Sequence, residues 1–141
     1  MTETSVPVRH LYKITLETAG VPIMLPAGPQ GTRMLVGVTG GRFKGERLSG
    51  AVVAPGGDWV TQRADGSIKL DVRVVLKTDD DASILVTYNG VGVVVEGQLK
   101  ARCAPLFETG DERYAWLNNI QAVGIGGLDG TDVVYDIYEL L

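Results

Sequence analysis

The segment Ser67–Asn89 brings acidic, basic and hydrogen-bonding side chains together on one predicted β-hairpin. Asp71 and Arg73 are two residues apart, so on a strand they lie on the same face. A three-residue turn places Arg73 opposite Thr87, whereas a two-residue turn places it opposite Tyr88. A carboxylate beside a guanidinium stays ionised, and such a pair can orient a polar ligand. The alternative is a solvated outer face with a cross-strand ion pair.

A second cluster lies just before this hairpin and combines one aromatic with two charged residues, Asp58, Trp59 and Arg63. An aromatic wall beside charged groups at the mouth of a barrel can hold a flat organic ligand and fix its polar end. The alternative is a tryptophan that belongs to the core or covers it.

A third cluster combines a phenol, an indole and a carboxamide on the predicted strand Tyr114–Gly124. Strand alternation places Tyr114, Trp116 and Asn118 on one side. Such a face is unusual as pure core, because each polar tip needs a partner when it is buried. It fits a ligand-binding face and, equally, an interface between subunits, where tyrosine and tryptophan are enriched.

Other chemistry has little support in the residues. The single cysteine, Cys103, is interpreted as a small core residue, and the only histidine, His10, as structural. The acidic run Asp79–Asp81 lacks the glycine and glutamate spacing of a calcium loop. No catalytic triad, phosphate loop or metal cluster stands out, so we expect neither a metal nor a cofactor.

Length and charge limit the class of protein. A chain of 141 residues with 45% hydrophobic and 21% charged residues predicts one globular domain over residues 1–141. The net charge of −4, with 13 scattered Lys and Arg residues, argues against nucleic acid and against an acidic membrane surface. No secretory signal opens the chain, and no apolar run reaches the length of a membrane helix. We therefore expect a cytoplasmic protein.

Nineteen glycines separate short β-branched runs, which is typical of many strands joined by turns. The strongest period-two pattern covers Ser67–Lys77. Three prolines predict a loop over Val21–Thr32. Strands are predicted over Val8–Ala19, Arg33–Val38, Glu46–Ala54, Asp58–Ala64, Ser67–Lys77, Ser83–Asn89, Tyr114–Gly124 and Val133–Leu140, and a further hairpin or bend is predicted over Val93–Ala104.

Many antiparallel strands with almost no helix leave a sandwich or a closed barrel as the fold. Periodicity does not choose between them. Glycines inside or beside strands favour the strong coiling of a small barrel, and these are Gly37, Gly50, Gly97 and Gly124.

Several stretches resemble one known family: LYKITLE, the run that contains GGDW, R-x-DG, LDVR and TDD, then YAWLN and VVYDIYEL. The chain is similar to the domain of unknown function 3237 family, also called uncharacterised protein family 0311. The resemblance implies an all-β fold, a single closed antiparallel barrel of about 8–10 strands like the allene-oxide-cyclase and lipocalin barrels. It implies no established activity. Asp81 stands where the family usually has a glycine in the turn after TDD.

The family motifs coincide with the three clusters above. The candidate catalytic residues are Asp58, Arg63, Asp71, Arg73 and Tyr88, and the candidate ligand-binding residues are Trp59, Tyr114, Trp116 and Asn118. A small-molecule function for these residues requires Asp71, Arg73 and the two tryptophans to point into the barrel, and it loses its support if they point to bulk solvent.

The leading hypothesis is an enzyme that uses no cofactor and acts on a small aromatic or carbonyl-bearing compound by isomerisation, cyclisation, elimination or hydrolysis. An aspartate would be the base, a tyrosine the proton donor and an arginine the oxyanion stabiliser. Two alternatives stay open. One is a carrier barrel that binds a small organic ligand without changing it, and the other is a structural homo-oligomer whose interface is the strand with Tyr114, Trp116 and Asn118.

Overall fold

The computed structural model describes residues 1–141, which form ten strands and one short 3-10 helix. The elements are β1 Val8–Thr18, β2 Ile23–Gly28, β3 Gly31–Lys44, β4 Ser49–Gln62, β5 Ile68–Thr78, β6 Ser83–Val95, β7 Gln98–Cys103, β8 Leu106–Glu108, η1 Glu112–Asn119, β9 Ala122–Asp129 and β10 Asp132–Leu140. No helical segment is long and apolar enough to cross a membrane.

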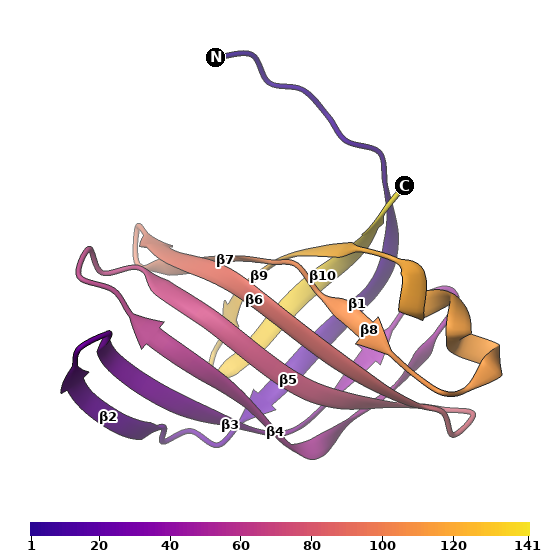
Figure 1. Ribbon diagram of the computed structural model, residues 1–141, viewed down its shortest axis with the longest axis horizontal. Helices are drawn as coiled ribbons and strands as arrows, with labels where there is room; N and C mark the ends of the chain where they lie inside the picture. The colour runs from indigo at the N-terminus through magenta and orange to yellow at the C-terminus, as the bar shows by residue number, and fades with distance from the viewer.

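Eight of the strands close into an antiparallel barrel (Figure 1). Around the ring they run β1, β10, β9, β7, β6, β5, β4 and β3, and β3 then pairs with β1 to complete the circle. The strand β2 lies beside β3, and β8 lies beside β6, both outside the ring path. The predicted closed barrel is confirmed, and the sandwich is excluded because closure leaves no edge strand in the ring.

Strand alternation separates the inside of the barrel from the outside. On β5 the side chains of Leu70, Val72 and Val74 are buried, and the residues between them face outward. The same rule around the ring gives one core cluster of 25 buried hydrophobic residues.

The two ends of the barrel differ (Figure 1). One end carries the β5–β6 turn and η1. Here Tyr12 packs edge-to-face on Phe43 at 5.6 Å and on Phe107 at 6.2 Å, and Leu117 of η1 is fully buried. The other end carries the β2–β3, β4–β5 and β6–β7 turns. The large side chains therefore close one end, and the open space lies toward the other.

The predicted strand Tyr114–Gly124 is wrong in its first half, where η1 forms instead. Asp111 caps this helix, and its carboxylate accepts from the main-chain amide of Arg113 at 2.9 Å. Further on, the side chain of Asn118 accepts a hydrogen bond from the main-chain amide of Thr109 and donates one to the main-chain carbonyl of Thr109. Such local bonds compete with a strand ladder, and period-two patterning does not reveal them.

The predicted loop Val21–Thr32 is also partly wrong, since Ile23–Gly28 forms β2. Pro26 is tolerated because the pairing with β3 slips between Leu25 and Gly28, where no ladder bond is needed. The two predicted strands Glu46–Ala54 and Asp58–Ala64 are one strand, β4, with an irregularity between Val53 and Gly57. A bulge lets one strand continue through a Pro-Gly-Gly sequence.

Candidate functional site

The open half of the barrel contains a cavity of about 230 Å³. Sixteen residues line it, and 13 of them are hydrophobic. They come from strands all around the ring, with Leu99, Leu128 and Thr131 among those near the turns. Leu128 is 57% exposed whereas Tyr135 is 2% exposed, so the cavity runs from an open mouth to a buried floor. A mostly apolar cavity with a few polar groups is the usual form of a small-molecule site.

Asp58 is the one charged residue of this lining. It lies in a row that crosses four strands, because Val36 pairs with Asp58, Asp58 with Val72, and Val72 with Tyr88. The row is four residues from the end of β4 at Gln62, or roughly 13 Å along the strand. The carboxylate is therefore deep in the cavity rather than at its rim.

The carboxyl group of Asp58 has one hydrogen bond within the protein. Its Oδ1 accepts from the main-chain amide of Asp71 at 3.0 Å, and its Oδ2 has no protein partner. Burial raises the pKa of Asp58 to about 6. The hydrogen bond from the Asp71 amide lowers this pKa, and the negative charge of the Asp71 side chain raises it further. At neutral pH most of the group is ionised, but a usable fraction is protonated. Such a group can both accept and donate a proton.

Two tyrosines lie beside Asp58 in the cavity. The rings of Tyr88 and Tyr135 meet edge-to-face at 5.7 Å, and both residues are buried. Neither phenol donates to a carboxylate or carbonyl of the protein, and no fully buried polar side-chain atom lacks a partner. Both residues line the cavity, and the Tyr88 hydroxyl donates to the hydroxyl of Tyr135. Burial raises the pKa of both phenols above their ordinary value, so both stay protonated and can donate. At Tyr135 the hydrogen bond from the Tyr88 hydroxyl lowers the pKa and so offsets part of this rise.

Tyr135 was missed by sequence reasoning, although the sequence does contain a signal for it. Tyr135 pairs with Gly126 on β9. A Cβ at Gly126 would lie 2.5 Å from the ring of Tyr135, and a Cβ at Gly124 would lie 2.7 Å from Ile137. Glycines in a strand mark places where another group approaches closely. The glycines of β9 thus make room for the tyrosine that forms the cavity floor.

Asp71 and Arg73 lie on the outer face of the barrel. The three-residue turn is confirmed, since Arg73 pairs with Thr87 and Asp71 with Asn89. The expectation that both side chains point into the barrel is wrong, because the apolar residues of β5 take the inner positions. The alternative of an outer face is therefore confirmed, but its cross-strand ion pair is not formed, because neither Asp71 nor Arg73 takes part in a salt bridge.

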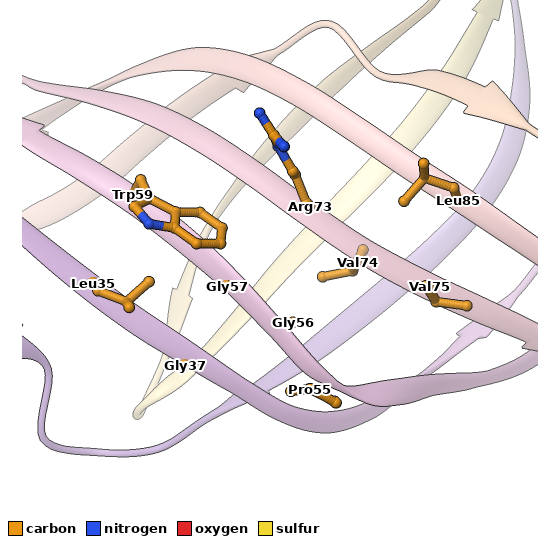
Figure 2. A pocket seen from close by; sticks show the side chains of 10 residues that line it. All are labelled: Leu35, Gly37, Pro55, Gly56, Gly57, Trp59, Arg73, Val74, Val75 and Leu85. Atoms are coloured by element: carbon orange, nitrogen blue, oxygen red, sulfur yellow. The ribbon is translucent and has the colours of Figure 1, made fainter.

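Trp59 also lies on the outer face and is 44% exposed, so it neither belongs to the core nor forms a wall of the cavity. Figure 2 shows Trp59 on β4 and Arg73 on β5 beside one shallow groove of about 450 Å³. A Cβ at Gly57 would lie 3.2 Å from the indole, so the ring rests on bare backbone. Arg63 lies in the β4–β5 turn, where its Nε donates to Oγ of Ser67 at 2.9 Å. Neither residue lines the cavity.

The cluster of Tyr114, Trp116 and Asn118 lies on η1 at the closed end. The hydroxyl of Tyr114 donates to the carboxylate of Asp80 at 2.8 Å. The guanidinium of Arg47 lies 3.9 Å from the Trp116 ring centroid. These contacts attach η1 to the barrel, and none of the three residues reaches the cavity.

No group of three or more His, Cys, Asp and Glu side chains is arranged to hold a metal. Cys103 is buried, as expected, and burial raises the pKa of its thiol to about 12. A thiol of that pKa is not a nucleophile at neutral pH.

With the barrel and its cavity described, the chain can be compared with known proteins. The model of the family described as "Protein of unknown function (DUF3237)" matches residues 7–140. The chain belongs to the DUF3237 family. A UPF0311 protein of Rhodopseudomonas palustris strain TIE-1 is 31% identical over 92% of this chain and 95% of its own length. A solved β-barrel-like protein of Acinetobacter baumannii AYE superposes with a TM-score of 0.91 at 26% identity, over 99% of both chains.

Two matches from the fungus Penicillium herquei are described as enzymes. The hydroalkoxylation enzyme phnH of Penicillium herquei is 38% identical to this chain over 87 residues, which is 62% of this chain and 52% of phnH. A solved enzyme from Penicillium herquei superposes with a TM-score of 0.80 at 26% identity, over 100% of this chain and 98% of the other. Members of this fold family therefore include proteins described as enzymes.

Proposed function

We propose that this barrel is an enzyme that uses no cofactor and moves a proton on a small organic molecule bound in the cavity. The observation that carries the proposal is a carboxyl group of pKa about 6, set among apolar walls and beside two phenols. An acid or base works best when its pKa lies near the working pH. Asp58 is the proton-transfer group, and the bonded pair Tyr88 and Tyr135 supplies a hydrogen-bond donor to an oxygen of the substrate. Asp71 and Arg73 have no direct role in this proposal.

The chemistry needs no oxidant or external nucleophile. In the addition of a hydroxyl group to a carbon–carbon double bond, protonated Asp58 gives its proton to one alkene carbon. The hydroxyl oxygen bonds the other carbon, and its own proton goes to the Asp58 carboxylate, which restores the acid. In the other reaction considered, isomerisation beside a carbonyl, a phenol donor stabilises the negative charge that develops on the carbonyl oxygen. Isomerisation beside a carbonyl uses the same residues, with Asp58 first as base and then as acid.

The fungal relatives support an enzyme over a passive carrier. Hydroalkoxylation is the addition of a hydroxyl to a double bond, and phnH is named for that reaction. It is a proton-transfer reaction of the kind that an Asp58-centred cavity can perform. The similarity to phnH covers about half of that protein. We therefore take the class of reaction from phnH and do not take its substrate.

Two probes in heavy water test the proposal. Indanone reports proton abstraction next to a carbonyl, through deuterium uptake on carbon. Ortho-prenylphenol reports addition, through a cyclised product that carries carbon-bound deuterium. We expect turnover of at least one probe by the wild-type protein and a loss of about a hundredfold or more in Asp58→Asn.

Asp81→Asn is the matched control, since it makes the same chemical change in the β5–β6 turn at the far end. Equal rates for wild type and Asp58→Asn would overturn the proposal. Saturable binding of both probes with no deuterium uptake would instead indicate a carrier barrel.

A further inference from the structure

The polar groups of the cavity define what a ligand must offer. Asp58 has one oxygen, Oδ2, that accepts no hydrogen bond from the protein. The hydroxyl of Tyr88 donates to the hydroxyl of Tyr135, which leaves the Tyr135 hydroxyl as a donor with no carboxylate or carbonyl of the protein to accept from it. An unpaired polar group in an apolar site costs free energy, so the fitting ligand supplies a donor for Asp58 and an acceptor for a tyrosine.

We propose that the substrate is an uncharged molecule with a hydroxyl group on a single ring, and that the hydroxyl enters first and bonds both Asp58 and a tyrosine. This inference rests on the proposed function, because it names the substrate class of the same cavity. A hydroxyl is the smallest group that both donates and accepts. It satisfies the carboxylate and one phenol at the same time.

Charged ligands fit the cavity less well. A carboxylate or phosphate supplies no donor for Asp58 and brings a second negative charge beside it. The lining contains no Lys, Arg or His that could neutralise such a ligand. An organic ammonium supplies donors but no acceptor, so the phenols would gain no partner. Transfer of either charge out of water is costly without a full set of partners.

The volume of the cavity limits the size of the ligand. A cavity of about 150 Å³ lined by apolar residues binds benzene. The cavity here is about 230 Å³, which leaves room for one ring with a short substituent. The ring and its substituent then contact the apolar residues between the Asp58 row and the mouth, such as Val60, Leu70 and Leu99.

Four ligands on one scaffold test the substrate class with the wild-type protein. They are para-ethylphenol, ethylbenzene, para-ethylbenzoate and para-ethylbenzylamine, titrated near neutral pH and followed by amide chemical shifts. The Asp71 amide is the internal reporter because it donates to Asp58. We expect para-ethylphenol to bind about tenfold or more tightly than each of the other three, as one hydrogen bond to a charged group allows. The Asp71 signal should shift most with this ligand.

The inference is overturned if the benzoate or the ammonium binds as tightly as the phenol, or if none of the four binds. In Asp58→Asn, the preference for para-ethylphenol over ethylbenzene should fall to about threefold or less, because the charged acceptor is lost. The carboxamide oxygen of this variant can still accept from the Asp71 amide. The proposed function and the substrate class can be contradicted separately. If the four ligands bind in the expected order but neither probe is turned over, only the proposed function is contradicted. If a probe is turned over but anionic ligands bind most tightly, only the substrate class is contradicted.

Discussion

The main-chain amide of Asp71 donates to Oδ1 of Asp58 at 3.0 Å, although the two side chains lie on opposite faces of the barrel wall. The amide orients the cavity carboxylate from the neighbouring strand. The Asp71 carboxylate, on the outer face, also contributes to the raised pKa of Asp58. A surface charge thus affects a group inside the cavity.

Asp71→Asn should lower the pKa of Asp58. The substitution removes a nearby negative charge and keeps the main-chain amide, so the ionised form of Asp58 becomes easier to reach. The pKa can be followed by carboxyl-carbon resonances, and any pH profile of turnover should move to lower pH with it. Asp81→Asn at the far end should leave the titration unchanged. An unchanged or raised pKa in Asp71→Asn would contradict this coupling.

Asp58→Asn should stabilise the protein at neutral and alkaline pH. The folded-state pKa of about 6 lies above the ordinary value of 3.8, so between these values the folded state binds more protons than the unfolded state. The free energy of unfolding contributed by Asp58 therefore falls as pH rises through this window, and the loss is complete above about pH 6. Urea unfolding should show Asp58→Asn more stable than wild type by roughly 1–2 kcal/mol at about pH 8, after allowance for partial exposure and for the buried amide.

The same comparison at about pH 4 should show little or no advantage for Asp58→Asn, because wild-type Asp58 is then neutral in the folded state. An advantage that is equal at both pH values would mean that the gain comes from packing rather than from the charge.

Tyr88→Phe should reduce turnover of a responsive probe by about tenfold or more while the protein stays folded. The substitution removes the hydroxyl that bonds Tyr135 in the donor pair and keeps the ring that packs against Tyr135. The free energy of unfolding should change by about 1 kcal/mol, since the hydroxyl loses only its bond to the hydroxyl of Tyr135. Tyr138→Phe is the matched control, because Tyr138 packs on His10 and does not line the cavity. Equal losses in both variants would remove the argument for Tyr88.

Asn118→Ala should destabilise the protein by roughly 1–2 kcal/mol, measured by urea unfolding. Its side chain accepts from the Thr109 amide at 2.8 Å and donates to the Thr109 carbonyl at 3.0 Å, which fixes the connection between β8 and η1. Asn119→Ala changes the neighbouring side chain, which makes no such bond, and should have an effect of about 0.5 kcal/mol or less. If the two variants behaved alike, Asn118 would not be fixing η1.

The sequence by itself determined most of the strands and the identity of the family. Alternating residues on β5, glycine-rich turns and the motifs GGDW and LDVR were enough to predict an antiparallel barrel. The register of the β5–β6 hairpin was narrowed to two alternatives, a three-residue or a two-residue turn, and the structure has the three-residue turn. These features are local, because a strand and a hairpin are specified by residues close together in the chain.

The tertiary structure alone decided which polar residues share a space. Asp58 and Tyr88 meet in one row because β4, β5 and β6 pair in one particular register. Tyr135 reaches the same cavity from β10 across the barrel, and its spacing from Asp58 and Tyr88 in the sequence does not predict that they share a cavity. Asp71, Arg73 and Trp59 had the right residue types, but β-strand alternation gives the inside to whichever face is apolar. The closure of the ring, and not the type of each residue, selects Asp58 among the candidate acids.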